Sequence, residues 1–426
     1  MKSNWRNYLI LSGCISLLSN GLGCAHPSSQ ALAEEPDALG SAFAEFSATL
    51  ASVEDSIRAS ASFRDSQEEV GGYRHMLRSM AKSLEAEVIQ DSDYPYFRIL
   101  DFWLREGGDN PDQRYAFSPI RGGVAYRVWG KIGSAARVEL QIYSGRPWAG
   151  DGRSAGYLRF EDIAIDDDGA FEIIVSAEKS PGNWLKNPDD STTLFARHIY
   201  DDWSDADTGE IHIDRVGYEG SRRIGETPEE LAQRIRDAAA MFKATAESWP
   251  AFVARRYVAA AEPNSVTVPR DTYALGGVRG RWMSGGYFSL EHGEAVLLRM
   301  PASEAKYQGI QLTDMWFASL EHGNQVSSLN TRQSLLSPDG AYYYVISQED
   351  PGFANWLDAG ALVRGTFLLR WDGVDGALAP EQFPSAETIF LEQVEEKIPG
   401  FVQVGEGERE SIRSQRRRHL QRRSHR

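Results

Sequence analysis

The sequence predicts a mainly β protein with helical additions (α+β), built from two tandem β-sandwich units of a jelly-roll-like type. Short segments in which apolar and polar residues alternate, as around Leu140 and Ile142, are separated by Gly and Asp clusters, and this is the pattern of strands and turns. In addition, residues 115–203 resemble residues 286–371. Internal similarity of this kind predicts two copies of one fold.

Four blocks match in the same order in the two segments, and their spacings agree within one or two residues. The matched blocks are Tyr115–Ser118 with Tyr287–Ser289, Leu140–Ile142 with Ile310–Leu312, Asp168–Phe171 with Asp339–Tyr342, and Pro181–Leu185 with Pro351–Leu357. In the third block an Asp-Gly turn leads into a strand, as hairpin chemistry favours. Ordered matches at nearly constant spacing seldom arise by chance, so we predict a duplicated unit of roughly 85 residues.

Helices are predicted before the first unit and between the two units. In residues 36–90, apolar residues recur at alternating steps of four and three, which places them on one helix face: Leu39, Phe43, Phe46, Leu50, Val53 and Ile57. Ser66 with Glu69 forms a capping-box pattern at the start of a second helix. Thr227 ahead of Pro228 predicts the start of a long helix that connects the two units.

These patterns predict a division of the chain into six parts. The expected parts are a leader over 1–23, a helical region over 24–105, a first sandwich over 106–220, a helical linker over 221–262, a second sandwich over 263–400 and a basic tail over 401–426.

The first residues have the pattern of an export signal. Lys2 and Arg6 precede an apolar run that is too short to span a bilayer as a mature helix. Cys24 follows a lipoprotein-type box and is the processing site that we favour, while Cys14 and a cut after Ala33 are the alternatives. We therefore expect export to the periplasm or cell envelope, with Cys24 lipidated and anchored in the outer membrane. A mature chain that begins at Cys24 has one cysteine and no internal disulfide.

The charge distribution argues against nucleic acid as the main partner. The formal net charge is −16, and the basic stretch is the tail over 411–426, which holds seven arginines. Nucleic-acid binding needs Lys and Arg clustered over a surface. We expect the tail to be a solvated helix end, with contact to an anionic membrane or to the acidic body as the alternatives.

Three groups of motifs, spread over roughly residues 70–400, are shared with a known family. They are Gly107–Asp112; Gly182–Leu185 with Arg197 and Asp202-Trp203; and Ser328–Asn330 followed by Asp350–Gly352 and Asn355–Asp358. On these residues the chain resembles the bacterial proteins grouped under domain of unknown function 1214, often paired with domain of unknown function 1254. The resemblance implies a β-sandwich architecture with helical additions, and it supplies no activity, cofactor or catalytic residue.

The loop that carries Asp109, Asn110, Asp112 and Arg114 is the first candidate site. It lies outside the second copy, so duplication of a scaffold does not account for it, and polar loop residues are where binding or catalysis concentrates. A turn built on Asn110 and the proline after it, with local capping by Asp, is an equally good interpretation.

The Asn-Trp pairs are a second candidate. Asn183 with Trp184 and Asn355 with Trp356 offer an apolar ring face, an N–H donor and amide groups, which suit sugars or amphipathic ring compounds. Because both copies keep the pair, a structural role at the start of a strand is favoured. The other candidate ligand-binding residues are Arg197, Asn330 and Arg370.

Two further patterns carry weaker signals. The Gly-x-Ser-x-Gly string over 152–156 lacks the strand-to-helix context of a nucleophile elbow, so we reject a serine hydrolase and expect a surface loop. The string Ser-Leu-Glu-His-Gly occurs at 289–293 and at 319–323, and its His and Glu could bind a divalent metal if the two turns met. We prefer exposed turns and predict no metal and no cofactor.

Three functions are therefore compatible with the sequence. The first is a lipid-anchored protein that binds a small amphipathic or saccharide ligand between or at the ends of the sandwiches. The second is a periplasmic hydrolase or lyase that uses loop carboxylates and His, and the third is an interaction module of the envelope. No nucleophile, metal set or phosphate loop decides between them, so enzymatic status and oligomeric state are open, with a slight preference for binding.

Overall fold

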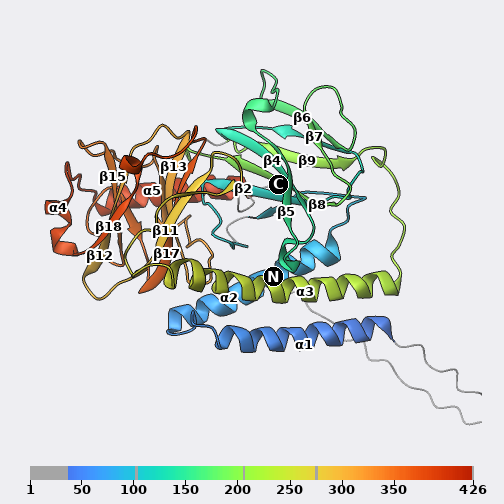
Figure 1. Ribbon diagram of the computed structural model, residues 1–426, viewed down its shortest axis with the longest axis horizontal. Helices are drawn as coiled ribbons and strands as arrows, with labels where there is room; N and C mark the ends of the chain where they lie inside the picture. The colour runs from blue at the N-terminus through green and yellow to red at the C-terminus, as the bar shows by residue number, and fades with distance from the viewer. Residues whose placement is uncertain (1–36, 101–103, 205–206, 274–276, 425–426) are drawn as a thin grey trace, which may run out of the picture. The chain divides into compact units, whose positions relative to one another are not determined.

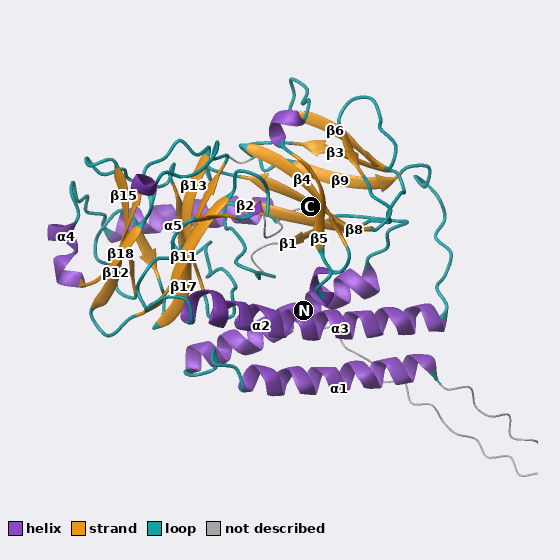
Figure 2. Ribbon diagram, viewed as in Figure 1, coloured by secondary structure: helices purple, strands orange, loops and turns teal. Residues whose placement is uncertain are grey.

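The computed structural model describes residues 37–100, 104–204, 207–273 and 277–424. One compact unit spans Ala38–Arg426, and it contains four β-sheets and a group of helices (Figures 1 and 2). The fold is therefore the mixed α+β class with tandem β units that the sequence predicts. The candidate processing sites at Cys14, Cys24 and Ala33 lie outside the described residues.

The first sandwich packs a five-stranded sheet, in the order β1-β2-β8-β4-β5, on a four-stranded sheet, in the order β7-β6-β3-β9. Its strands are β1 (Arg98–Leu100), β2 (Gln113–Pro119), β3 (Tyr126–Lys131), β4 (Arg137–Ser144), β5 (Arg153–Leu158), β6 (Ala170–Ser176), β7 (Trp184–Lys186), β8 (Ser191–Ile199) and β9 (Glu210–Arg215). Leu140 and Ile142 of β4 are fully buried in the core between the sheets.

The second sandwich repeats this topology, with sheets in the orders β10-β11-β17-β13-β14 and β16-β15-β12-β18. Its strands are β10 (Arg270–Asp271), β11 (Trp282–Ser289), β12 (Glu294–Pro301), β13 (Tyr307–Thr313), β14 (Ser328–Asn330), β15 (Ala341–Ser347), β16 (Trp356–Asp358), β17 (Arg364–Asp372) and β18 (Ser385–Phe390). One described strand pair in each copy is parallel: β6 with β7 in the first copy and β15 with β16 in the second. The other described strand pairs are antiparallel. The duplication predicted from the sequence is confirmed.

The strand registers confirm three of the four matched blocks and correct the first. Phe117 lies opposite Phe195 of β8, and the position that corresponds to it in the second copy is Gly285, opposite Leu368. The predicted partner, Phe288, is three residues further along and is fully buried in the second core. Phe117 instead stacks on Phe195 on the other face of its sheet, with ring centroids 4.2 Å apart, so the two phenylalanines are not equivalent.

Three long helices form a layer beside the sheets (Figure 2). They are α1 (Ala38–Arg58), α2 (Ser66–Leu84), which continues as a π-helical turn over Glu85–Ile89, and α3 (Pro228–Val253), which also continues as a π-helical turn, over Ala254–Val258. Val53, Met76 and Phe242, one from each helix, pack together with Trp316 of the second sandwich. The linker helix α3 is thus a structural part of this layer. Phe43, expected on the buried face of α1, is 66% exposed.

The helix caps agree with one prediction and correct another. Thr227 caps α3 with a capping box that includes Glu230, and Pro228 is the first helical residue. In α2 the N-cap is Asp65, whose carboxylate accepts hydrogen bonds from the N–H groups of Gln67 and Glu68, so the predicted cap at Ser66 is one residue late.

The basic tail is an ordered helix, α5 (Glu406–Arg423), which follows the short helix α4 (Val394–Lys397). Arg409, Arg416, His419 and Arg423 of α5 are all buried. The expectation of a solvated helix end agrees with the exposed Arg417, Arg418 and Arg422. It is wrong for Arg416 and Arg423, because their guanidinium groups find carbonyl and aromatic partners inside the protein.

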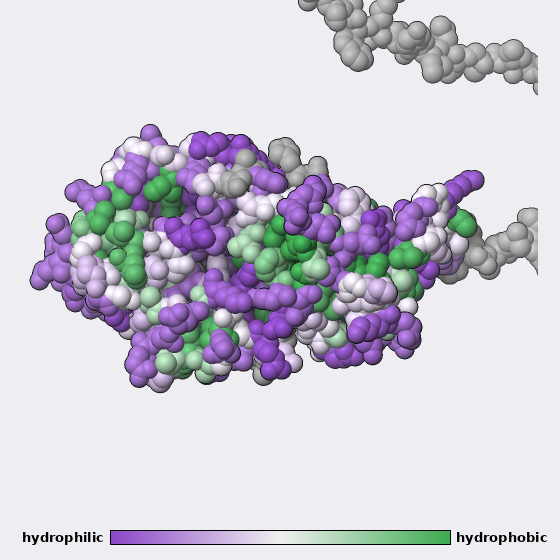
Figure 3. Space-filling view, turned by 90° about the horizontal axis from the view of Figure 1, so that it is seen from above, coloured by the Kyte–Doolittle hydropathy of each residue, from purple (hydrophilic) through white to green (hydrophobic). Residues whose placement is uncertain are grey.

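The surface is mixed in character. On the face shown in Figure 3, hydrophobic residues form several patches separated by hydrophilic ones. Among the described residues, no helix combines the length and the apolar character that a membrane crossing requires.

Candidate functional site

The loop over 104–112 lies against the second sandwich, on the sheet face that is turned away from its core. The N–H of Gly108 donates to the carbonyl of Phe317 at 2.7 Å, and the carbonyls of Gly108 and Asp109 accept hydrogen bonds from Gln311. Gly108 has a φ of +65°, and a Cβ at this position would lie 2.6 Å from the Phe317 ring. Only glycine fits this close approach.

Asp112, at the end of this loop, is the centre of a polar cluster between the two sandwiches. Its Oδ2 accepts from the hydroxyl of Tyr307 at 2.6 Å, and its Oδ1 accepts from Nε1 of Trp203 at 2.9 Å and from Nδ2 of Asn330 at 3.0 Å. Burial raises the pKa of the Asp112 carboxyl, although the hydrogen bond from Tyr307 and the charge of Arg416 act in the opposite direction. Because three side chains from distant segments meet at this carboxylate, Asp112 joins the two copies.

An arginine-glutamine pair is repeated in the two copies. Arg197 donates from Nη2 to Oε1 of Gln141 at 2.9 Å, and Arg370 donates to Oε1 of Gln311. The two glutamines occupy the same position in the matched blocks. Arg370 also donates to the carbonyl of Gly108, which brings the repeated pair of the second copy into contact with the loop.

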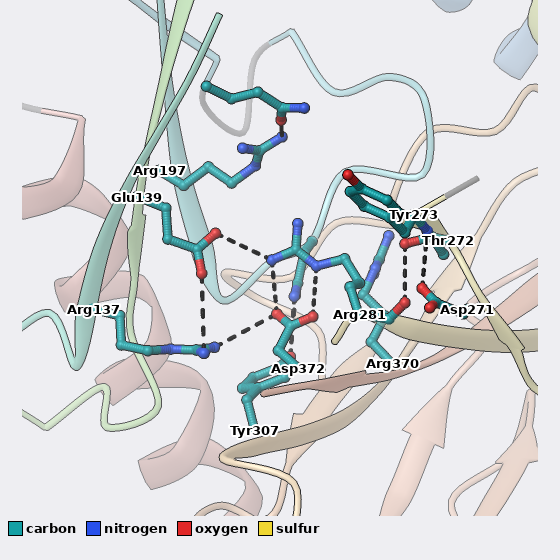
Figure 4. A network of polar contacts seen from close by, with 12 residues as sticks. Arg137, Glu139, Arg197, Asp271, Thr272, Tyr273, Arg281, Tyr307, Arg370 and Asp372 are labelled. Atoms are coloured by element: carbon teal, nitrogen blue, oxygen red, sulfur yellow. Dashed lines mark hydrogen bonds and ion pairs between the residues drawn. The ribbon is translucent and has the colours of Figure 1, made fainter. Parts of the chain in front are cut away.

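A buried ion-pair network links the sandwiches beside these pairs (Figure 4). Nη2 of Arg281 donates to Oδ2 of Asp372 at 2.9 Å and lies 3.3 Å from Oε2 of Glu139, while Nη2 of Arg137 lies 3.6 Å from Oδ2 of Asp372. Burial alone would raise the pKa of the Asp372 carboxyl, but the charge and hydrogen bonds of Arg281, together with the charges of Arg137 and Arg370, hold this pKa below its usual value. Two arginines and two carboxylates therefore compensate one another across the interface.

Helix α5 covers the Asp112 cluster. Nε of Arg416 donates to the carbonyl of His322 at 2.8 Å, and Nη2 of Arg423 donates to the carbonyl of Pro111 at 2.7 Å. Both guanidinium groups lie over the indole of Trp203, at 4.2 and 5.1 Å from the ring centroid. Burial lowers the pKa of each arginine to about 10, so both are charged at neutral pH.

A groove of about 390 Å³ lies between the first sandwich, the second sandwich and α5. The residues that line it are Asp201, Asp202, Trp203, Val326, Leu329, Arg332, Gln333, Ala354, Arg409, Ile412, Gln415 and Arg416. Asp201 and Arg332 form an ion pair at 2.8 Å across the sandwiches. The volume lies within the range of small-molecule sites, and the wall combines apolar side chains with acids, amides and arginines.

The Asn-Trp pairs are structural in both copies. Nδ2 of Asn183 donates to the carbonyls of Ala164 and Glu172, at 2.8 and 2.9 Å. Nδ2 of Asn355 makes the same bonds to the carbonyls of Leu335 and Tyr343, at 2.8 and 3.0 Å. The favoured interpretation of these pairs, a role at the start of a strand, agrees with this geometry.

Each tryptophan of the pairs is tied to its own copy. Trp184 donates to the hydroxyl of Ser176 at 3.1 Å, and Trp356 donates to the hydroxyl of Ser347 at 2.9 Å. Trp356 also carries the guanidinium of Arg409 over its ring, at 5.1 Å from the centroid.

The Gly-x-Ser-x-Gly string and the two Ser-Leu-Glu-His-Gly strings lie in different structural environments. Ser154 of the Gly-x-Ser-x-Gly string lies on strand β5, where its hydroxyl accepts from Gln141 at 2.8 Å. His292 of the first Ser-Leu-Glu-His-Gly string is exposed, as expected, whereas His322 of the second is buried beside α5, contrary to expectation. Among the described residues, no three His, Cys, Asp or Glu side chains are placed to hold a metal ion together.

The structure thus brings together part of the predicted set. The candidate residues that gather between the sandwiches are Asp109, Asn110, Asp112, Arg114, Asn330, Arg197 and Arg370. Tyr307, Arg416 and Arg423 belong to the same region and were missed. Arg409, Arg416 and Arg423 are seven residues apart, a spacing that places them on one helix face and that could have revealed their burial.

Comparisons with known proteins support the fold. No model of a known protein family matches the chain, and no curated protein matches it. A solved structure of an uncharacterized protein from Burkholderia cenocepacia is similar, with 25% identity and a TM-score of 0.77 over 83% of this chain and 98% of that one. A Vibrio parahaemolyticus protein matches with 11% identity and a TM-score of 0.43 over 75% of this chain and 97% of that one. The first of these similarities confirms the β-rich architecture.

Proposed function

We propose that the protein binds a small amphipathic or saccharide ligand in the groove between the two sandwiches and α5. The observation that carries this proposal is the groove of about 390 Å³, whose wall contains residues from both copies and from the C-terminal helix. Val326, Leu329 and Ile412 offer an apolar surface, while Gln333 and Gln415 offer donors and acceptors for hydroxyl groups. A ligand with both kinds of surface matches this wall.

Binding is preferred over catalysis because the candidate acid is already engaged. The Asp112 carboxylate, which a hydrolase or lyase would use, is buried and accepts three hydrogen bonds from side chains. The two oxygens of the Asp112 carboxylate therefore hold the sandwiches together. A general base, by contrast, needs a free acceptor oxygen within reach of its substrate.

The test uses octyl β-glucoside below its micelle-forming concentration, with methyl β-glucoside and octanoate as its separate polar and apolar halves. Saturation-transfer NMR on the full chain should detect binding of octyl β-glucoside. Gln415 lines the groove, so Gln415→Trp should fill it and weaken binding at least tenfold. The matched control is Gln421→Trp, an exposed glutamine of the same helix outside the groove. Binding that Gln415→Trp leaves unchanged, or no binding by any of the three probes, would refute the proposal.

We also propose that the protein is exported and that Cys24 carries a lipid anchor to the outer membrane. The support is the leader pattern, in which Lys2 and Arg6 precede a short apolar run and a lipoprotein-type box. Labelling of cells with an alkyne fatty acid should mark the wild-type chain and the Cys14→Ala variant, and should fail with Cys24→Ala. Labelling that follows Cys14, or none in the wild type, would contradict the assignment.

A further inference from the structure

A second cavity lies at the end of the first sandwich, apart from the groove. It has a volume of about 20 Å³, which suits one occupant of roughly the size of a water molecule or a halide ion. Its wall includes Asn110, Gln113 and Arg114 at the start of β2, His322 of the second copy, and Arg423 of α5. Asp109 and the apolar residues Ile99, Leu100 and Leu420 also line it, so three separate parts of the chain border a small space of mixed polarity.

Two arginines present uncommitted donors at this cavity. Arg114 and Arg423 are 5% and 6% exposed. Each uses one nitrogen on a carbonyl, because Nη1 of Arg114 donates to Gly209 and Nη2 of Arg423 donates to Pro111. Nε and Nη2 of Arg114 and Nη1 of Arg423 are buried and have no hydrogen-bond partner within the described part of the chain. Buried N–H groups of a cation are costly to leave unpaired.

The charge around the cavity is also unbalanced. Arg114, Arg416 and Arg423 are buried, and the nearby carboxylates are Asp112 and Asp109. Asp109 lines the cavity, but its two oxygens accept hydrogen bonds from the backbone and the hydroxyl of Ser319. Among the described residues none of the three arginines forms an ion pair within 4 Å. Asp112 accepts its three hydrogen bonds from neutral side chains. Asp207 and Glu210 raise the pKa of Arg114 only from exposed positions, and burial lowers that pKa more strongly.

We infer that this cavity is a binding site for one small monovalent anion, of which chloride is the abundant example, held by the guanidinium groups of Arg114 and Arg423. A water molecule could accept the free N–H groups, but it would leave the surplus positive charge uncompensated in a low-dielectric environment. The anion would bind the start of β2 to the last turn of α5, and so fasten the C-terminal helix to the first sandwich.

Crystals of the full chain in sodium bromide test the site directly. Anomalous diffraction at the bromine edge should show a peak between the guanidinium groups of Arg114 and Arg423, and Arg114→Gln should remove it. A wild-type map with no bromine peak at this place overturns the inference, and so does a peak that persists undiminished in Arg114→Gln.

A solution experiment separates the site from general salt effects. At constant ionic strength, replacing sodium gluconate by sodium chloride should raise the Tm of the wild type by a few degrees in a saturable way, because the anion binds the folded state. The neighbouring exposed arginine gives the matched control, Arg422→Gln, which should keep the chloride response, whereas Arg423→Gln and Arg114→Gln should lose it. Equal responses in all four proteins would overturn the inference. If Arg423→Gln fails to fold, Arg114→Gln and the bromide map still decide the question.

Discussion

The two sandwiches share their topology but differ in how each meets its surroundings. Both keep the Asn-Trp turn and the arginine-glutamine pair in the same registers. The position of Arg137, by contrast, is taken by Tyr307 in the second copy, and the two side chains reach different partners, Asp372 and Asp112. The shared residues thus hold each copy together, and in the second copy they also contact the 104–112 loop and α5. Positions that differ, such as Arg137 and Tyr307, give each copy its own contact with the other.

The strongest test of this division is the removal of Asp112. Asp112→Ala should lower the free energy of unfolding by about 3–5 kcal/mol, because it leaves Tyr307, Trp203 and Asn330 without their acceptor and strips the buried arginines of their carboxylate. Urea unfolding of the full chain measures the loss. The exposed residue Asp375 gives the control, and Asp375→Ala should change stability by less than about 0.5 kcal/mol. Similar values for the two variants would show that the interface cluster is dispensable.

The Asn-Trp turns of the two copies differ in burial, so the same substitution should cost different amounts of stability in the two copies. Asn355 is 1% exposed, whereas Asn183 is partly exposed, although the two make equivalent hydrogen bonds. Asn355→Ala should therefore cost about 2–3 kcal/mol and Asn183→Ala about 1 kcal/mol, because water can replace the lost partner only at the exposed turn. The measurement is urea unfolding of both variants. A larger loss of unfolding free energy for Asn183→Ala than for Asn355→Ala would contradict this prediction.

Buried histidines predict a pH dependence that the two copies share. Burial lowers the pKa of His198 in the first sandwich and of His322 beside the second well below the usual value. Both are neutral when folded but take up a proton when unfolded below about pH 6.5, so their contribution to stability is present above that pH and is lost as pH falls. Each should account for at most about 1.4 kcal/mol per pH unit.

The difference between wild type and His198→Gln in unfolding free energy, followed from pH 7 to pH 5, isolates this effect from that of the carboxyl groups. The exposed His292 gives the control, since its side chain is 96% exposed, and His292→Gln should change the free energy of unfolding at pH 7 by less than about 0.5 kcal/mol. If the unfolding free energy falls with pH as steeply in His198→Gln as in the wild type, a group other than His198 causes the pH dependence.

The smallest effect is expected at the exposed contact between the copies. Lys306 pairs with Glu161 of the first sandwich, and both side chains are about half exposed. Lys306→Met should change the free energy of unfolding by less than about 0.5 kcal/mol, because solvent screens such pairs. Urea unfolding in low and high salt would check this, and a loss above about 1 kcal/mol would show that the surface contact matters as much as the buried ones.

Local chemistry made much of the fold predictable from the sequence. The Asp-Gly turns, the Asn-Trp turns and the cap at Thr227 depend on residues close together in the chain, and the structure agrees with each. The loop at Asp112 was identified because it has no counterpart in the second copy. The prediction of the α2 cap was wrong because two neighbouring residues, Asp65 and Ser66, can each act as an N-cap.

Contacts across long stretches of chain were not predictable. Tyr307 meets Asp112 and Arg416 meets His322 only because the second sandwich and α5 fold back on the first. Residue type alone predicts that the arginines of α5 are exposed, since arginine is seldom buried without a partner. Their partners are backbone carbonyls, the Asp350 carboxylate and aromatic rings, and no sequence pattern in this chain indicates these pairings.

The position of α5 sets an order of events during biogenesis. Of the described elements it is the last to be synthesised, yet it covers Trp203 and supplies two of the arginines around Asp112. Until the final turn has emerged, Trp203 and the Asp112 cluster lack the cover that Arg416 and Arg423 provide. Docking of α5 is therefore a late step, and a nascent chain that stalls before residue 406 would lack the helix that covers the Asp112 cluster.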